Sequence, residues 1–190
     1  MSVRMLRSAL IAGALSVVSA PAGLAQAPVP EEARAAMEPL AWLAGNWAGE
    51  ATITDRGGTR VLHQSEAVRP ALEGSLLVVD GTGRELASGG ELGEVAFRAF
   101  AVMSAGDEAG RYRVAAWQSG RFVDARAEVD EGGTLTWGFA TPDGGEVRYV
   151  IRQPEPDVWH ETGAFRRSGE DTWRPFIEMT LRREPSGSAR

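Results

Sequence analysis

The sequence predicts an all-β protein, whose one domain is an antiparallel up-and-down β-barrel of about ten strands. From residue 46 onward no helical period is sustained over three turns. Short alternating segments are instead separated by Gly, Asp and Pro residues, which is the pattern of strands and hairpins. Most connections are only two to five residues long. They predict antiparallel neighbours, because a parallel crossover needs about a dozen residues or more.

Closure of the sheet follows from the number of strands. An open meander of ten strands would leave two long unpaired edges, and a closed barrel has none. A barrel of about eight to ten strands is wide enough to keep a cavity for one small ligand. A β-sandwich is the alternative architecture. The expected strands span residues 46–55, 59–69, 74–81, 94–104, 110–118, 121–129, 133–140, 145–153, 157–166 and 173–183.

The first 27 residues have the three parts of a secretory signal peptide. Arg4 and Arg7 give a basic start, residues 10–18 form an apolar run, and residues 25–27 (AQA) are a small-x-small cleavage site. The run is too short for a transmembrane helix. We therefore expect cleavage after Ala27 and a periplasmic or secreted protein with no membrane span after cleavage. An uncleaved anchor is the alternative.

The rest of the chain divides into three parts. Residues 28–36 are a polar, Pro-containing lead that we expect to be flexible, and residues 185–190 are expected to form a disordered tail. Residues 37–184 form the barrel domain. Within this domain, residues 37–43 predict a short helical turn that closes one end of the barrel. The Gly-rich residues 81–93 are a candidate flexible flap.

Composition excludes several kinds of chemistry. The 190-residue chain has no Cys, and all 20 of its basic residues are Arg, which excludes a thiol nucleophile, a disulfide framework and a lysine Schiff base. Loss of residues 1–27 removes two arginines and lowers the formal net charge from −6 to −8. This charge disfavours binding to nucleic acid. Common catalytic motifs are also absent, and the sequence predicts no catalytic residue, no metal site and no cofactor.

Both ends of the barrel segment carry parts of one motif. Gly45-Asn46-Trp47 opens the first strand, and Arg182-Arg183 ends the last. These strands meet when the barrel closes, so a guanidinium can lie on the indole ring in a cation–π contact. A glycine lets the backbone pass close to the ring. This arrangement resembles the Gly-x-Trp motif and closing arginine of lipocalin-like (calycin) barrels.

The likeness extends over nearly all of the chain after residue 27. Residues 40–50 (LAWLAGNWAGE), 159–163 (WHETG) and 178–183 (EMTLRR) are similar to bacterial domains of unknown function with a lipocalin-like or nitrobindin-like fold. Nitrobindin-type proteins bind haem through a histidine in the closing strand, a few residues before a Leu-x-Arg ending. Residues 175–183 contain no histidine, so the resemblance does not carry the haem function over.

Glu161 is the most informative candidate for a ligand contact. It shares a strand face with Trp159 and Gly163, so an inward face would make it a polar group in a mainly apolar cavity. Such a carboxylate can orient a ligand or act as a base with a raised pKa. Alternatively, it pairs with an arginine on a neighbouring strand. The full set of candidate ligand-binding residues is Glu161, His160, Tyr149, Trp117, Trp159 and His63.

These observations favour an exported protein that binds a small hydrophobic or aromatic molecule in its barrel cavity. The first alternative is a cofactor-independent lyase, isomerase or hydrolase, in which Glu161 and His160 or His63 form an acid–base pair. Adjacent strand residues point to opposite faces, so Glu161 and His160 can both face inward only at a bulge. The second alternative is an envelope interaction protein with a filled barrel. The sequence leaves the oligomeric state open.

Overall fold

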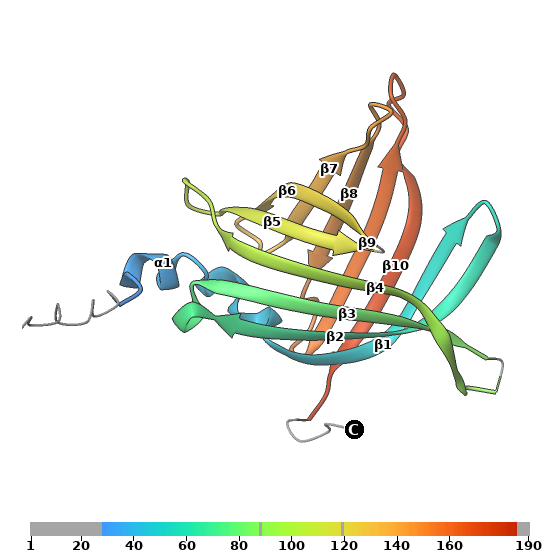
Figure 1. The fold of residues 1–190 in the computed structure, drawn as a ribbon, viewed down its shortest axis with the longest axis horizontal. Helices are drawn as coiled ribbons and strands as arrows, with labels where there is room; N and C mark the ends of the chain where they lie inside the picture. Colours follow the sequence, from blue (N-terminus) through green and yellow to red (C-terminus); the bar gives the residue numbers. More distant parts are fainter. Residues whose placement is uncertain (1–27, 88, 119, 186–190) are drawn as a thin grey trace, which may run out of the picture.

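The fold is a single closed barrel of ten strands (Figure 1). The structure is a computed structural model that describes residues 28–87, 89–118 and 120–185. Each strand pairs antiparallel with its neighbours in sequence, and β1 (Gly45–Asp55) pairs with β10 (Arg174–Arg183) to close the sheet. The predicted all-β up-and-down barrel is therefore confirmed, and the β-sandwich alternative is excluded.

The remaining strands follow one another around the barrel with short connections. They are β2 (Gly58–Ala71), β3 (Leu76–Leu86), β4 (Leu92–Ala105), β5 (Arg111–Gln118), β6 (Arg121–Val129), β7 (Leu135–Ala140), β8 (Glu146–Arg152) and β9 (Val158–Arg166). Three short helical segments lie outside the sheet: α1 (Glu31–Ala35), η1 (Glu38–Leu43) and η2 (Leu72–Gly74). Among the residues that the structure describes, no helix is long and apolar enough to cross a membrane.

Two segments contain helix or strand where the sequence predicted neither, and their expected flexibility stays a prediction. Residues 81–93 were expected as a flap, but β3 continues to Leu86 and β4 begins at Leu92, so most of this segment is strand. Its pairing shifts register at two places, which identifies bulges in a Gly-rich hairpin. Residues 28–36, expected as a loose lead, include α1, which buries no residue. The expected signal peptide and residues 186–190 of the expected tail lie outside the described residues.

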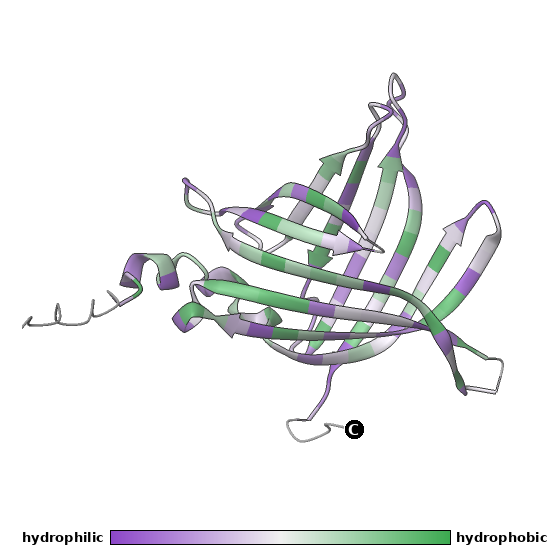
Figure 2. Ribbon diagram, viewed as in Figure 1, coloured by the Kyte–Doolittle hydropathy of each residue, from purple (hydrophilic) through white to green (hydrophobic). Residues whose placement is uncertain are grey.

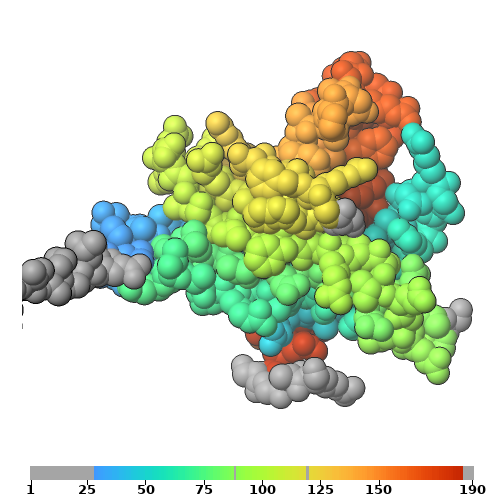
Figure 3. Space-filling model, viewed as in Figure 1, coloured from blue at the N-terminus to red at the C-terminus, as the bar shows by residue number. Residues whose placement is uncertain are grey.

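Alternation along the strands separates the inner wall from the outer wall. In β5, Tyr112 and Val114 are buried while Arg111 and Arg113 are exposed. Hydrophobic and hydrophilic residues alternate in this way along many strands (Figure 2). On one face of the molecule, β3 to β6 lie side by side as a continuous wall (Figure 3). A shift of one residue in any strand would expose its apolar set, so burial fixes the register.

Three tryptophans, one of them in η1, close one end of the barrel. Trp42, Trp47 and Trp159 pack edge to face, with ring centroids 5.8 to 6.1 Å apart. Each such pair contributes about 0.5–1.5 kcal/mol beyond its area burial. The Trp47 Nε1–H donates to the Leu43 carbonyl at 2.7 Å, which ties the barrel wall to η1. η1 is thus the predicted helical turn at the barrel end, formed as a 3-10 helix.

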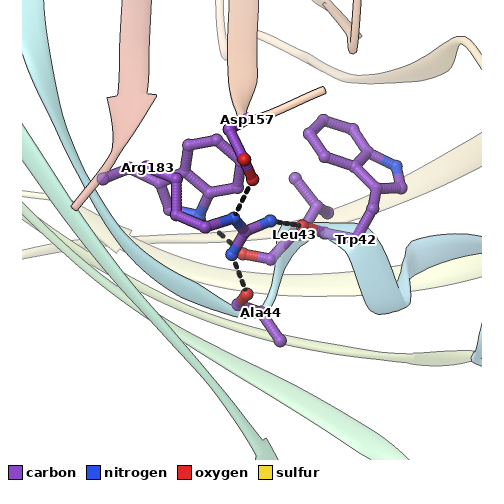
Figure 4. Close-up of polar contacts among 6 residues, drawn as sticks. Trp42, Leu43, Ala44, Asp157 and Arg183 are labelled. Atoms are coloured by element: carbon purple, nitrogen blue, oxygen red, sulfur yellow. Dashed lines mark hydrogen bonds and ion pairs between the residues drawn. The ribbon is translucent and has the colours of Figure 1, made fainter. Parts of the chain in front are cut away.

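Arg183 fastens this end from the closing strand. Its guanidinium carbon lies 4.1 Å from the centroid of the Trp47 ring. The same group donates to the carbonyls of Trp42 and Ala44 and to the Asp157 carboxylate (Figure 4). One side chain therefore connects β1, β10, η1 and the residue before β9.

The first position of the Gly-x-Trp motif requires glycine for conformational and steric reasons. Gly45 has φ of +141°, which side chains disfavour, and an added Cβ would lie 2.2 Å from Nη1 of Arg183. Any other residue would displace the guanidinium from the ring. Arg182, the other arginine of the predicted motif, is exposed on the opposite face of β10.

Candidate functional site

A cavity of about 360 Å³ lies inside the barrel. Its volume falls within the range of about 300–1,000 Å³ that small-molecule sites occupy. Small side chains on β4 and β5 leave this space free, and larger aromatic and aliphatic side chains form the rest of the wall. The apolar lining includes Ala99, Ala101, Met103, Ala116, Leu135, Trp137, Phe139, Ile151, Phe176 and Ile177. A barrel with this free volume is not the filled barrel of the interaction hypothesis.

Several polar side chains line this apolar space, and three of them are the most buried. Gln64 and Glu66 come from β2, where they alternate with outward residues, and Glu161 comes from β9. Gln64 is 1% exposed and Glu161 is 8% exposed. Glu66 is surrounded by protein on most sides, and its accessible part borders the cavity. Burial of three such groups is costly unless each finds a partner.

Two hydrogen bonds hold the polar groups in place. The Gln64 Nε2–H donates to Oε1 of Glu66 at 2.7 Å. The Trp159 Nε1–H donates to Oε2 of Glu161 at 3.2 Å, and both side chains lie on the same face of β9. The Oε1 atom of Gln64 is buried and has no hydrogen-bond partner among the described residues. A buried acceptor of this kind is a vacant position for a donor.

Glycines on β3 make room for the β2 polar pair. Gly81 lies opposite Glu66 in the β2–β3 register, and an added Cβ at Gly81 would lie 2.6 and 2.7 Å from the two carboxylate oxygens. Gly83 lies opposite Gln64, where an added Cβ would lie 3.0 Å from its Oε1 and 2.4 Å from the Phe97 ring. Because Gly81 and Gly83 carry no side chain, the barrel has room for the side chains of Gln64 and Glu66.

Burial raises the pKa of both carboxyl groups. Desolvation raises the pKa of Glu66 from 4.5 to about 7, against the hydrogen bond from Gln64, and the Asp80 charge raises it further. Desolvation raises the pKa of Glu161 to about 8, with a further increase from the Glu66 charge. Burial and then the Glu161 charge raise the pKa of the Tyr149 hydroxyl. Both carboxyl groups therefore titrate near neutral pH.

Three of the sequence-predicted ligand contacts line the cavity together. Glu161 and Trp159 form the hydrogen-bonded pair on β9, and Tyr149 faces the same space from β8. The Tyr149 ring stacks on Trp137, with centroids 4.3 Å apart and planes 11° from parallel. These two rings give the cavity a flat aromatic wall.

Both histidines lie on the outer wall. His63 precedes the inward Gln64, and His160 precedes the inward Glu161, in strands whose pairing is regular at these positions. His160 Nε2 lies 3.3 Å from a carboxylate oxygen of Glu178, which is exposed. Neither imidazole can ligate a haem inside the barrel. Because no bulge separates His160 from Glu161, the acid–base pair that combines them does not form.

Trp117 belongs to an aromatic ladder near the mouth of the barrel. Its ring contacts Phe100 of β4 and Phe122 of β6, with centroids 6.0 and 5.1 Å away. All three residues are exposed, and they alternate with inward residues such as Val114 and Val123. Trp117 also borders the cavity, so it marks the rim rather than the interior.

Sequence reasoning missed Gln64 and Glu66. The signal was present, because Leu62, Gln64, Glu66 and Val68 recur at every second position and therefore share one face. Leu62 and Val68 are buried, so two polar residues between them must also face inward. A polar pair that interrupts an apolar strand face is the pattern that would have found this site.

A larger hollow of about 880 Å³ lies outside the barrel, over β5 to β8. Charged side chains dominate its lining, and several are already paired, as in the contacts of Arg111 with Glu128 and of Arg166 with Glu146 nearby. Its charged side chains are exposed, so water screens their interactions. The cavity inside the barrel is therefore the better candidate site. Within the described ranges, no group of three or more His, Asp or Glu side chains could hold a metal ion.

No protein-family model and no curated protein sequence matches this chain. Solved structures do match. The Rv2717c protein of M. tuberculosis is similar with a TM-score of 0.64 and 13% identity, over 79% of this chain and 98% of that one. The S-type phycobiliprotein lyase CPES of Guillardia theta is similar with a TM-score of 0.55 and 11% identity, over 76% and 90% of the two chains.

Both neighbours are lipocalin-like barrels. This chain has the same lipocalin-like barrel fold. At such low identity the likeness establishes the fold, and function has to be argued from the site.

Proposed function

We propose that the protein is exported and binds a small, mainly apolar molecule inside its barrel. The observation that carries the proposal is the cavity of about 360 Å³ inside the barrel, with an aromatic and aliphatic wall and a few convergent polar groups. Export is supported by the signal-peptide pattern of residues 1–27. The likeness to Rv2717c and to a phycobiliprotein lyase supports a barrel architecture that suits an internal ligand.

The positions of the polar and apolar lining residues along the barrel axis determine how the ligand is oriented. Glu66 lies opposite Trp47 in the β1–β2 register, close to the end that η1 closes. Arg60, near the start of β2, and Ile53, its partner near the end of β1, lie toward the mouth. An apolar body would fill the middle of the barrel, and a polar head would reach the carboxylates at depth. Burial of the body supplies about 25 cal/mol for each Å² of apolar surface removed from water.

Fluorescence of N-phenylnaphthylamine tests this proposal. This neutral probe emits strongly only in apolar surroundings, so the protein should increase its emission and saturate at one probe per chain. Ala101→Phe, which places a phenyl ring in the cavity, should weaken binding by about tenfold or more. Phe122→Ala, which shortens the external ladder, is the matched control and should leave the affinity within about twofold.

The outcome separates the cavity from the outer wall. Loss of binding in Phe122→Ala but not in Ala101→Phe would assign the probe to the external ladder and overturn the proposal. Absence of any emission increase with the wild-type chain would also overturn it. A second cavity variant, Ala116→Phe, covers the case in which Ala101→Phe fails to fold, as judged by its thermal unfolding.

A further inference from the structure

The three most buried polar side chains of the cavity present hydrogen-bond acceptors that few donors reach. Glu66 receives one donor from Gln64, and Glu161 receives one from Trp159, whereas an ionised carboxylate has about four acceptor positions. The Gln64 Oε1 atom, in a side chain that is almost fully buried, receives none. The unoccupied positions of all three residues belong to groups that line the same cavity.

The cavity also lacks a matching positive charge. Among the described residues, neither Glu66 nor Glu161 takes part in an ion pair. Arg60 is the one cationic side chain in the cavity lining, and it lies toward the mouth, 3.5 Å from carboxylate oxygens of both Asp55 and Glu85.

The other titratable groups around the carboxylates add no positive charge. Asp80, on β3, contributes negative charge to the surroundings of Glu66. Tyr149, on β8, keeps its proton because its pKa is raised. The electrostatic field at the bottom of the cavity is therefore negative whenever either carboxyl group ionises.

A cation with N–H donors would satisfy this cluster. Buried carboxylates are stabilised by charge-assisted hydrogen bonds, which are roughly twice as strong as neutral ones. An ammonium group offers up to three N–H donors and one positive charge, whereas a carboxylate or a phosphate on the ligand would be repelled. The aromatic wall of Trp137 and Tyr149 would hold the apolar body.

We propose that the cavity selects apolar amines: molecules with a hydrophobic body and a protonated amine that donates to Glu66, Glu161 and the Gln64 carbonyl. This inference rests on the proposed ligand-binding function and names the chemical class of the ligand. Amine binding favours the ionised carboxylates and displaces protons from them. The affinity for an amine should therefore rise as pH increases from about 6 to 8.5, while the affinity for a neutral analogue should not.

Displacement of bound N-phenylnaphthylamine by three matched compounds tests the selectivity. Phenylbutylamine, phenylbutanol and phenylbutyrate share one hydrophobic body and differ in the charge of the head group. Near pH 8, phenylbutylamine should displace the probe at about one tenth of the concentration that phenylbutanol requires, and phenylbutyrate should be the weakest.

Substitution of the carboxylates assigns the selectivity to the cluster. Glu66→Gln and Glu161→Gln keep the size of the side chains and remove the charge, so each should reduce the preference for the amine by about fivefold or more. Glu50→Gln, on the exposed outer face of β1, is the matched control and should leave the preference unchanged.

The possible outcomes separate this inference from the proposed function. Equal displacement by the amine and the alcohol, or a preference that neither carboxylate variant reduces, would overturn the selectivity for amines while leaving ligand binding intact. Failure of the probe itself to bind would overturn the proposed function. An amine preference that increases with pH and is lost in both variants would establish the inference.

Discussion

Glu66 and Glu161 link the stability of the barrel to pH. Both groups have an ordinary pKa of 4.5 in the unfolded chain, and burial raises these values to about 7 and about 8 in the folded protein. The folded protein therefore binds more protons than the unfolded chain between about pH 4.5 and 8. Their contribution to the free energy of unfolding is full below about pH 4.5 and is lost as pH rises through 7 and 8.

We expect the wild-type protein to unfold at a lower temperature near pH 8.5 than near pH 5.5, by about 5 °C or more. Glu161→Gln carries no titrating group at this position, so its unfolding temperature should depend less on pH. Calorimetry of the two proteins, with Glu50→Gln as the exposed control, measures the difference. A wild-type protein that is more stable at pH 8.5 than at pH 5.5 would contradict the buried positions of the carboxyl groups.

At the scale of residues, the sequence predicted part of the site. Glu161, Trp159 and Tyr149 lie around one cavity, as alternation suggested for the first two. Gln64 and Glu66 were missed because the candidate titratable residue on this strand was His63, which precedes them and points outward. The space that Gly81 leaves for the Glu66 side chain depends on the register of β2 with β3. Sequence alone does not give that register.

At the scale of elements, strand periodicity was a reliable guide except at bulges. Nearly all ten strands lie within a few residues of their predicted bounds, because turn residues and alternation are local signals. In β10, however, the register shifts between Pro175 and Ile177. Unbroken alternation along residues 173–183 would put Trp173 on the face of Ile177, whereas the Trp173 ring contacts the guanidinium groups of Arg148 and Arg166 on the outer wall. A single inserted residue reverses the predicted direction, inward or outward, of every side chain before it in the strand.

The seam between β1 and β10 gives a prediction at this scale. Gly49 lies opposite Leu181, and an added Cβ would lie 2.1 Å from the backbone oxygen of Thr180. Because backbone atoms cannot rotate away, Gly49→Ala should force the closing strands apart and cost about 1–3 kcal/mol of unfolding free energy. Urea denaturation measures this cost.

Gly89→Ala is the control for this substitution. Apart from the two neighbouring residues in the chain, no described residue has an atom within 4 Å of a Cβ added at Gly89, so the unfolding free energy of this variant should change by less than about 0.5 kcal/mol. If Gly49→Ala were as stable as this control, the close approach of β1 and β10 at the seam would be wrong.

At the scale of the whole molecule, closure was predictable and cavity volume was not. The need to remove two sheet edges, together with Gly45, Trp47 and a closing arginine, is visible in the sequence. The structure assigns the contact to Arg183, which lies on Trp47, while Arg182 is exposed. Free volume depends on how all inward side chains pack together, and no local pattern encodes that sum.

The central claim is that a ligand enters the barrel and lies among its inward aromatic residues. Nuclear magnetic resonance of the indole N–H groups tests it directly, because six tryptophans report from different places. On titration with phenylbutylamine, the signals of Trp137 and Trp159, which line the cavity, should shift and saturate together. The signal of Trp173, between two arginines on the outer wall, should stay in place. Shifts confined to Trp117 and Trp173, with Trp137 and Trp159 unchanged, would contradict the account.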